Sequence, residues 1–229
     1  MSPVVAIIPA RGGSQSIRRK NLARLNGEPL VTRAIRQAQA ARTVDRVIVN
    51  SEDAEIRAVA AAAGAEVMDR PEAFHHDNSV QEVDRLLRWS IIEDEKTSPR
   101  CGIVVLLYAT SPFRTPADID ACVERVELEG YDSALSLQRD HSYLWRETGD
   151  VVVPTNYVPA ERGPRQKEAW NQLVENKAVY AMRRDLLVDT GCRLGGRIGW
   201  VEMPRLRSID IDAPDDLRLA EALLAAGAV

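Results

Sequence analysis

Short apolar runs alternate with amphipathic stretches along most of this 229-residue chain. The runs typical of strands are residues 4–8, 44–50, 65–68, 103–107 and 133–137. Helical spacing or helix-start signals mark residues 29–41, 53–63, a stretch from Ser79, one from Thr115, and 214–226. Strands that alternate with helices predict an α/β fold, in which helices cover both faces of a mainly parallel sheet.

One region breaks this alternation. From about residue 138 to 178 the chain is rich in charge, proline and tryptophan, without clear periodicity. We interpret it as an excursion from the sheet, either a lid or an arm that meets another subunit. The length suits a single domain over residues 1–229 with this region inserted.

Composition excludes several function classes. A net charge of −4 argues against a general nucleic-acid binder. No apolar segment approaches the ~20 residues of a membrane helix, and no cationic segment precedes the first apolar run, so we expect neither a membrane protein nor a signal peptide. Cys101, Cys122 and Cys192 match neither a disulfide framework nor a zinc spacing. We expect all three to be small core residues in a reducing, cytoplasmic setting.

A glycine-rich, cationic loop follows the first predicted strand. Residues 8–17 read IPARGGSQSI, and residues 18–21 read RRKN. Glycines let successive backbone N–H groups point into one concavity, and the cations neutralise an anion held there. The loop matches neither GxGxxG nor GxxxxGK[ST], so an ordinary strand–helix turn is the alternative. So much positive charge beside the turn favours a polyphosphate site.

Two carboxylates two residues apart form a second candidate. On a strand, residues 208–212 (SIDID) would turn Ile209 and Ile211 to the core and leave Asp210 and Asp212 together on the other face. Paired carboxylates repel unless a cation lies between them, and Mg²⁺ with phosphate oxygens suits such a pair. Asp212 could instead cap the last helix, whereas Asp210 has no such structural role.

Other segments also follow predicted strands. Residues 106–114 (LLYATSPFR) end the most apolar strand, where they contact substrate or simply turn into the next helix. Ser79 with Glu82 forms a capping box, which favours a structural role for Ser79, while Arg70 has less structural reason to be present. The cationic residues 162–167 could contact an acidic substrate or form a solvated loop.

Read in order, these motifs resemble those of the CMP-sialic acid synthetases, the acylneuraminate cytidylyltransferases, and relatives that act on other nonulosonic acids. The shared motifs are IPARGGS at 8–14, RP at 70–71, LLYATSPFR at 106–114, RQ at 165–166 with NKAVY at 176–180, and SIDID before PDDLRLAE at 214–221. The resemblance runs from residue 4 to about 223, and the motifs in this order are highly specific.

The resemblance implies a three-layer, Rossmann-like nucleotidyltransferase fold and a homodimer whose protruding arm reaches the partner's active site. It implies that CTP and a 2-keto sugar acid give a CMP-sugar and pyrophosphate, with Mg²⁺ as cofactor. Arg11, Lys20, Asp210 and Asp212 would be catalytic, and the two aspartates would hold the metal. The implied nucleotide-binding residues are Ala10, Arg11, Gly12, Gly13, Ser14, Lys20, Asn21, Arg70, Asn78, Ser79 and Gln81. The implied substrate-binding residues are Tyr108, Thr110, Ser111, Arg165, Gln166 and Tyr180.

Three departures from the family pattern bear on the substrates. Gln15 stands where the family has Lys, which removes one phosphate cation that Arg18 or Arg19 could replace. Tyr108 stands in place of Gln and lacks the amide's two-sided hydrogen bonding, so we expect a sugar acid other than N-acetylneuraminate. Lys177 replaces Gly, and its cation could meet a carboxylate or close down space.

Two other functions stay open at this point. One is a nucleotidyltransferase that makes an NDP-sugar from a sugar phosphate, with Arg165 and Lys177 as the phosphate-binding pair. The other is a non-catalytic relative that binds nucleotide as a sensor, against which the Asp210 and Asp212 pair argues. No side chain is singled out as a general base.

Overall fold

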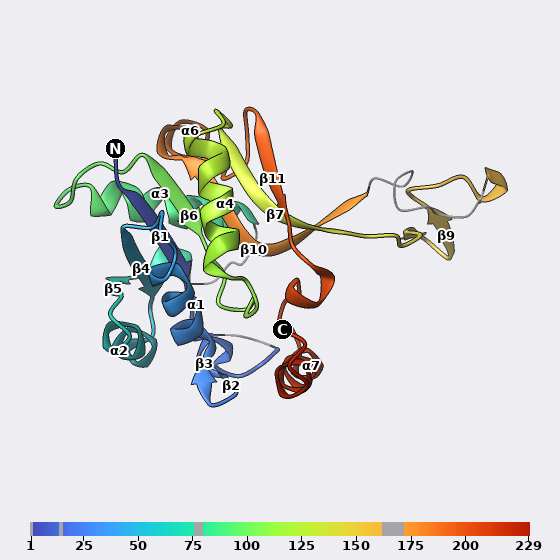
Figure 1. Cartoon of the computed structure of the whole chain (residues 1–229), viewed down its shortest axis with the longest axis horizontal. Helices are drawn as coiled ribbons and strands as arrows, with labels where there is room; N and C mark the ends of the chain where they lie inside the picture. The colour runs from blue at the N-terminus through green and yellow to red at the C-terminus, as the bar shows by residue number, and fades with distance from the viewer. Residues whose placement is uncertain (1, 14–15, 76–79, 162–171) are drawn as a thin grey trace.

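A seven-stranded sheet forms the centre of the fold (Figure 1). The computed structural model describes residues 2–13, 16–75, 80–161 and 172–229. The strand order across the sheet is β11-β7-β10-β6-β1-β4-β5. The strands are β1 (Val4–Pro9), β4 (Arg46–Ser51), β5 (Glu66–Asp69), β6 (Ile103–Leu106), β7 (Ser133–Arg139), β10 (Leu173–Arg183) and β11 (Ile198–Glu202).

The sheet is mainly parallel, as the strand–helix alternation predicts. Strand β1 runs parallel to β4 and β6, β4 to β5, and β7 to β11. Strand β10 lies antiparallel to both of its neighbours, β6 and β7. The α/β prediction is therefore confirmed, and the antiparallel strand is an addition to it.

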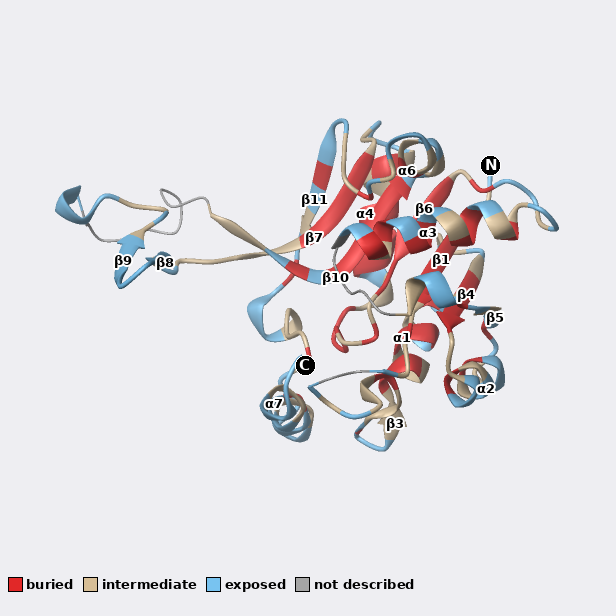
Figure 2. Ribbon diagram, turned by 180° about the vertical axis from the view of Figure 1, so that it is seen from behind, coloured by how far each residue is buried: buried red, intermediate tan, exposed pale blue. Residues whose placement is uncertain are grey.

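Helices cover both faces of the sheet, which makes three layers. Val4, Ala6 and Ile8 of β1 share a core with α1 (Leu30–Gln39), α2 (Ala54–Ala62) and α4 (Pro116–Glu127). Val5 and Ile7 face the other side, where they share a core with α3 (Val80–Asp94) and α6 (Arg184–Thr190). Figure 2 shows the buried residues concentrated in the sheet between these layers. Because both faces are covered, β1 reads as a continuous apolar run.

The chain ends in α7 (Pro214–Ala225), which lies beside the short hairpin of β2 (Arg24–Leu25) and β3 (Glu28–Pro29). The predicted cap at the start of α4 is present, because Thr115 and Asp118 form a reciprocal capping box. No helix within the described residues has the length and apolarity needed to cross a membrane.

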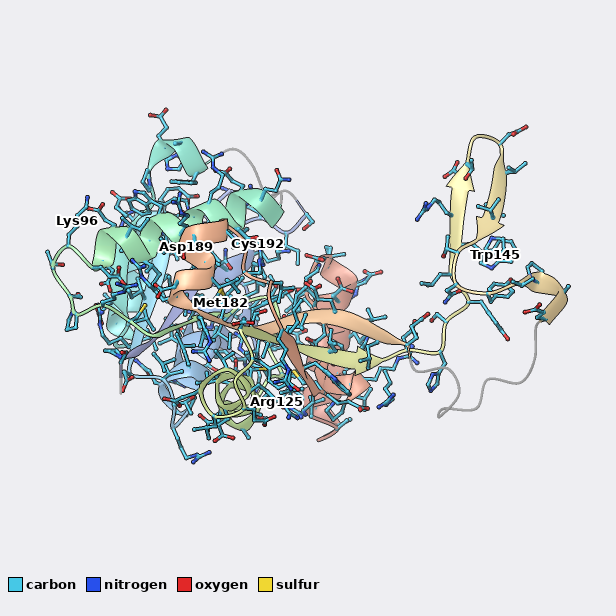
Figure 3. All side chains as sticks on the ribbon, turned by 90° about the horizontal axis from the view of Figure 1, so that it is seen from above. Lys96, Arg125, Trp145, Met182, Asp189 and Cys192 are labelled. Atoms are coloured by element: carbon cyan, nitrogen blue, oxygen red, sulfur yellow. The ribbon has the colours of Figure 1, made fainter. Side chains whose placement is uncertain are left out.

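An arm leaves the sheet between β7 and β10 and extends far from the body (Figures 1 and 3). It carries the antiparallel hairpin of β8 (Trp145–Thr148) and β9 (Val151–Pro154), and a 3-10 turn at Pro159–Glu161. The predicted excursion over 138–178 is too wide, because Leu173 still pairs with Arg139 in the sheet. The charged start of β10 concealed this strand from the sequence pattern.

The three cysteines differ in their surroundings. Cys101 and Cys122 are buried, as predicted, whereas Cys192 is exposed. The prediction for Cys192 is wrong because the residue lies in the loop that follows α6 and not on a buried face of an element.

Candidate functional site

A cavity of about 520 Å³ lies at the carboxyl ends of β1 and β6. This is where open α/β sheets bind ligands, and the volume suits a small-molecule site. The predicted site residues that line it are Arg11, Lys20, Asn21, Arg70, Tyr108, Thr110, Tyr180, Asp210 and Asp212. The lining residues that the sequence did not indicate include Phe74, Glu82, Val83, Leu86, Glu175 and Arg193.

The remaining predicted residues fall into two groups. Ala10 and Ser111 are buried and Gln81 is exposed, and neither they nor Gly12 and Gly13 line the cavity. The others lie outside the described residues, namely Ser14, Asn78, Ser79, Arg165 and Gln166, together with the departure at Gln15.

The loop after β1 approaches the start of α2 very closely. The backbone N–H of Gly12 donates to Glu52 Oε1 at 2.7 Å. A Cβ on Gly12 would lie 2.6 Å from Asp53 Oδ2. Asp53 caps α2, since its carboxylate accepts hydrogen bonds from the N–H groups of Glu55 and Ile56. Position 12 therefore requires glycine for a packing reason, and the Glu52 carboxylate accepts its N–H.

We expect Gly12→Ala to lower the free energy of unfolding by about 1–3 kcal/mol, because the new methyl group would push the Asp53 cap away from α2. Gly13→Ala is the matched control. No described atom lies within 4 Å of a Cβ at Gly13, so its effect should stay within about 0.5 kcal/mol. Urea denaturation of both variants measures the difference, and equal effects would contradict the packing role of Gly12.

The cations of the loop have different partners. Arg19, at a left-handed φ of 56°, places its guanidinium 3.0 Å from Asp53 Oδ2 and 2.6 Å from Glu55 Oε2. This pairing does not support Arg19 as the replacement for the phosphate cation lost at Gln15. Arg18 is exposed in the same loop and remains the other candidate.

Two predicted nucleotide contacts also brace the cavity wall. The amide of Asn21 donates to the carbonyl of Arg11 at 2.8 Å. Arg70 is buried, and its Nε and Nη2 donate to the side chain and the carbonyl of Asn50 at 3.0 and 3.2 Å. Burial lowers the pKa of Arg70. Arg70 thus has a structural role that its sequence position did not reveal.

Asp210 and Asp212 face two lysines across the cavity. The ammonium of Lys177 lies 2.8 Å from Asp210 Oδ2 and 3.4 Å from Asp212 Oδ2, and that of Lys20 lies 2.9 Å from Asp212 Oδ1. Partial burial opposes ionisation of Asp212, but the hydrogen bond and attraction from Lys20, and then those from Lys177, outweigh it and lower the pKa of Asp212. Both lysines thus favour the charged form of Asp212.

The segment that carries this pair is not a strand, contrary to the prediction. Residues 208–212 follow a 3-10 turn at Arg205–Arg207 and lie outside the sheet, with the N–H of Ile211 donating to Thr110 O at 2.8 Å. Ile209 and Ile211 nevertheless pack into the core, which leaves both aspartates on the cavity side. Asp212 does not cap α7 either, because the Asp216 carboxylate accepts the N–H groups of Asp212 and Ala213.

The aspartate pair fits a divalent cation whose other ligands would come from substrate and water. Asp210 Oδ1 is buried and has no hydrogen-bond partner among the described residues, which leaves its lone pairs available. The described part of the chain contains no cluster of three or more His, Cys, Asp or Glu side chains that could hold a metal alone. Mg²⁺ commonly binds through one or two carboxylates plus phosphate oxygens and water, so this donor set suits it.

Aromatic and cationic side chains form another wall of the cavity. The rings of Tyr108 and Tyr180 meet edge to face at 6.3 Å, and Arg193 donates to the Tyr108 hydroxyl at 2.8 Å. Arg193 also pairs with the buried Asp84 and lies 5.1 Å from the ring centre of Tyr180. Burial raises the pKa of Tyr108 and Tyr180, so both phenols stay neutral. Arg193 follows α6 outside any motif, and no sequence signal pointed to it.

A buried arginine holds this wall in place. Arg114 is only 2% exposed, and its Nη1 donates to the carbonyls of Tyr108 at 2.7 Å and Ala178 at 3.0 Å. These bonds tie the loop after β6 to β10. They fix Tyr108 in the same cavity as Lys177, which precedes Ala178.

Comparisons with known proteins show the family of the chain. The family described as Cytidylyltransferase matches residues 5–189. The chain is 33% identical over 222 residues to N-acylneuraminate cytidylyltransferase A of Danio rerio, which covers 95% of the chain and 50% of that protein. It therefore spans about half the length of the first curated relatives that it matches. It is 31% identical over 256 residues to 3-deoxy-manno-octulosonate cytidylyltransferase of Anaeromyxobacter dehalogenans, which covers 100% of both.

Solved structures share the fold. The structure of CMP:2-keto-3-deoxy-manno-octonic acid synthetase complexed with CTP matches with a TM-score of 0.69 and 19% identity, over 99% of this chain and 100% of that one. The structure of 4-diphosphocytidyl-2C-methyl-D-erythritol synthase from Anaerococcus prevotii matches with a TM-score of 0.70 and 10% identity, over 98% and 96%. The expected nucleotidyltransferase-type fold is confirmed.

Proposed function

The chain belongs to the cytidylyltransferase family, and on this premise we propose that it activates a sialic acid-like nonulosonic acid with CTP, giving a CMP-sugar and pyrophosphate. One observation carries the proposal. The cationic residues Arg11 and Lys20 and the Asp210–Asp212 pair, which lie about two hundred positions apart, line one cavity. The relatives reported above are, by their names, cytidylyltransferases of N-acylneuraminate and of 3-deoxy-manno-octulosonate.

The reaction is a nucleotidyl transfer. The anomeric hydroxyl oxygen of the acid loses its proton and forms a bond to the α-phosphorus of CTP, and the bond from that phosphorus to pyrophosphate breaks in line with it. Positioning and charge stabilisation account for most of such catalysis. Arg11 and Lys20 stabilise the charge that builds on the phosphates. Mg²⁺ held by Asp210 and Asp212 would supply Lewis-acid polarisation of the α-phosphate.

The nucleotide and the acid are assigned to different walls of the cavity. The loop of residues 10–14 with Lys20, Asn21, Arg70 and the start of α3 would bind CTP, as the family resemblance implies. Tyr108, Thr110 and Tyr180 would contact the acid, and the resemblance adds Arg165 and Gln166, which lie outside the described residues. The Tyr108 ring and its bond to Arg193 occupy the place where the family has a glutamine. This supports an acid other than N-acetylneuraminate.

A pyrophosphate-release assay tests the proposed function. CTP, UTP and GTP are each combined with N-acetylneuraminate, 3-deoxy-manno-octulosonate, several other nonulosonic acids and a set of sugar 1-phosphates. We expect release with CTP and one class of keto acid. Release with a sugar 1-phosphate would favour the rival NDP-sugar synthesis. CTP binding without release from any acid would favour the nucleotide-sensing alternative.

We also propose a homodimer in a cytoplasmic setting, to which the scattered cysteines are suited. The arm exposes many apolar side chains beyond the body (Figure 3). The exposed ones are Leu144, Trp145, Val151, Val152, Val153 and Val158. A lone two-stranded hairpin is only marginally stable in water, so packing against a second copy would stabilise this one.

The dimer proposal predicts a particle of twice the 25.4 kDa chain mass in light scattering. Val152→Asp places a charge on the exposed apolar hairpin and should shift the particle to a monomer. Val67→Asp, at an exposed valine on the edge strand β5, is the matched control and should leave the dimer intact. A wild-type monomer, or an unchanged Val152→Asp dimer, would contradict this role of the arm.

A further inference from the structure

Lys177 has a backbone conformation that ordinarily belongs to glycine. Its φ is 58°, in the left-handed region, and it lies where the pairing of β10 with β7 shifts register between Glu175 and Tyr180. A non-glycine residue in this region is strained, and such strain persists where surrounding contacts hold it. The contacts around Lys177 include those of its ammonium with the two aspartates and a hydrogen bond from the Ser111 hydroxyl to its carbonyl at 3.3 Å.

The lysines occupy most of the aspartate pair. Lys177 donates to Asp210 Oδ2 and Asp212 Oδ2, and Lys20 donates to Asp212 Oδ1. Three of the four carboxylate oxygens therefore have an ammonium partner. Asp210 Oδ1 alone has no partner among the described residues.

A divalent cation and the Lys177 ammonium need the same oxygens. One free carboxylate oxygen holds Mg²⁺ weakly, because this ion gives up its water reluctantly and usually needs phosphate oxygens as well. An ammonium already at 2.8 Å also repels a second cation. Metal binding to the free protein is therefore opposed by a side chain of the protein itself.

Nucleotide phosphates would favour the divalent cation over the Lys177 ammonium at these oxygens. Lys177 and Lys20 line the same cavity as Arg11, and the Lys177 side chain is half exposed. We propose that Lys177 is a resident counter-cation of the Asp210–Asp212 pair, and that the pair accepts a divalent metal only when nucleotide phosphates draw this ammonium away. The nucleotide half of the proposal rests on the proposed function. The exclusion of metal from the free protein does not.

Binding of Mn²⁺ to the nucleotide-free protein tests this directly. Proton relaxation enhancement reports protein-bound Mn²⁺, and no turnover is required. We expect Lys177→Met to bind Mn²⁺ about tenfold or more tighter than wild type, because it removes the competing charge and keeps a side chain of similar length. Lys96→Met removes an exposed ammonium that pairs with Glu93 and does not line the cavity, so it should leave the affinity unchanged; Lys96 is labelled in Figure 3.

Two further titrations test whether the gain in Mn²⁺ affinity arises at the Asp210–Asp212 pair. Adding Asp210→Asn to Lys177→Met should abolish the gain, which assigns the metal to this pair. Adding CTP without any acid should tighten Mn²⁺ binding to wild type far more than to Lys177→Met. Lys177→Gly, which also relieves the left-handed backbone, provides a second uncharged variant if Lys177→Met does not fold.

The proposal is overturned by equal Mn²⁺ affinities of wild type and both uncharged variants, by tight binding to wild type without nucleotide, or by a gain that survives Asp210→Asn. Failure of the proposed function shows itself separately. It would appear as no pyrophosphate release with any acid, while the nucleotide-free titrations still give their answer.

Discussion

Asp210→Asn is expected to lower kcat by at least about a thousandfold while the protein stays folded. Asp210 Oδ1 is buried in the cavity wall without a hydrogen-bond donor among the described residues, and the other carboxylate oxygen of Asp210 binds Lys177. An amide keeps the shape of the side chain but removes its charge. It therefore weakens both the hold on a divalent cation and the placement of Lys177. Steady-state kinetics with CTP and the acid identified by the pyrophosphate assay measures the loss.

Stability should change little in this variant. Asparagine keeps the shape of the Asp210 side chain, and Lys177 keeps Asp212 as a partner. Thermal melting should therefore stay close to that of wild type. Asp215→Asn is the matched control, because this highly exposed carboxylate on α7 pairs only with Arg218 among the described residues and does not line the cavity. Near-normal turnover of Asp210→Asn in Mg²⁺ would contradict the metal assignment.

The sheet could be predicted from the sequence because its strands carry their own signal. Strand β1 is covered on both faces, so its side chains form an unbroken apolar run. Strand β10 gave a weaker signal, because its first residues emerge from the arm and are charged or half exposed. Its antiparallel direction depends on the path of the arm, which no local pattern reports.

The aspartate pair shows how a prediction can reach the right side chains through the wrong element. Ile209 and Ile211 pack into the core although the segment does not join the sheet. The alternation of Ile and Asp therefore still separates the buried residues from those that face the cavity. The cap at Asp212 was ruled out only by geometry, since Asp216 accepts the N–H groups at the start of α7.

Contacts between distant parts of the chain could not be predicted from the sequence. Arg193 meets Asp84 across 109 positions and Tyr108 across 85, and neither spacing leaves a trace in a local pattern. The loop cation Arg19 is likewise diverted to Asp53 and Glu55, which lie in a different element. A motif predicts which residue types surround a ligand, and tertiary packing decides which of them remain available to it.

Lys20→Met is expected to lower kcat by about 100- to 1,000-fold, with a smaller effect on KM. The Lys20 side chain is only 14% exposed, and its ammonium lies in the cavity at 2.9 Å from Asp212 Oδ1. A charge held there without reorganisation stabilises the phosphates most when their charge increases, in the transition state. Lys20→Arg should recover part of the rate, because it restores the charge with a different geometry.

Arg18→Met is the matched control, because Arg18 is an exposed cation of the same loop. A loss as large as that of Lys20→Met would show that Arg18 replaces the missing cation at Gln15 and that Lys20 has no special place. A change confined to KM in Lys20→Met would reduce Lys20 to ground-state binding. Combining Lys20→Met with Asp210→Asn should cost less than the sum of the two, because Asp212 and Lys177 link both residues in one charge network.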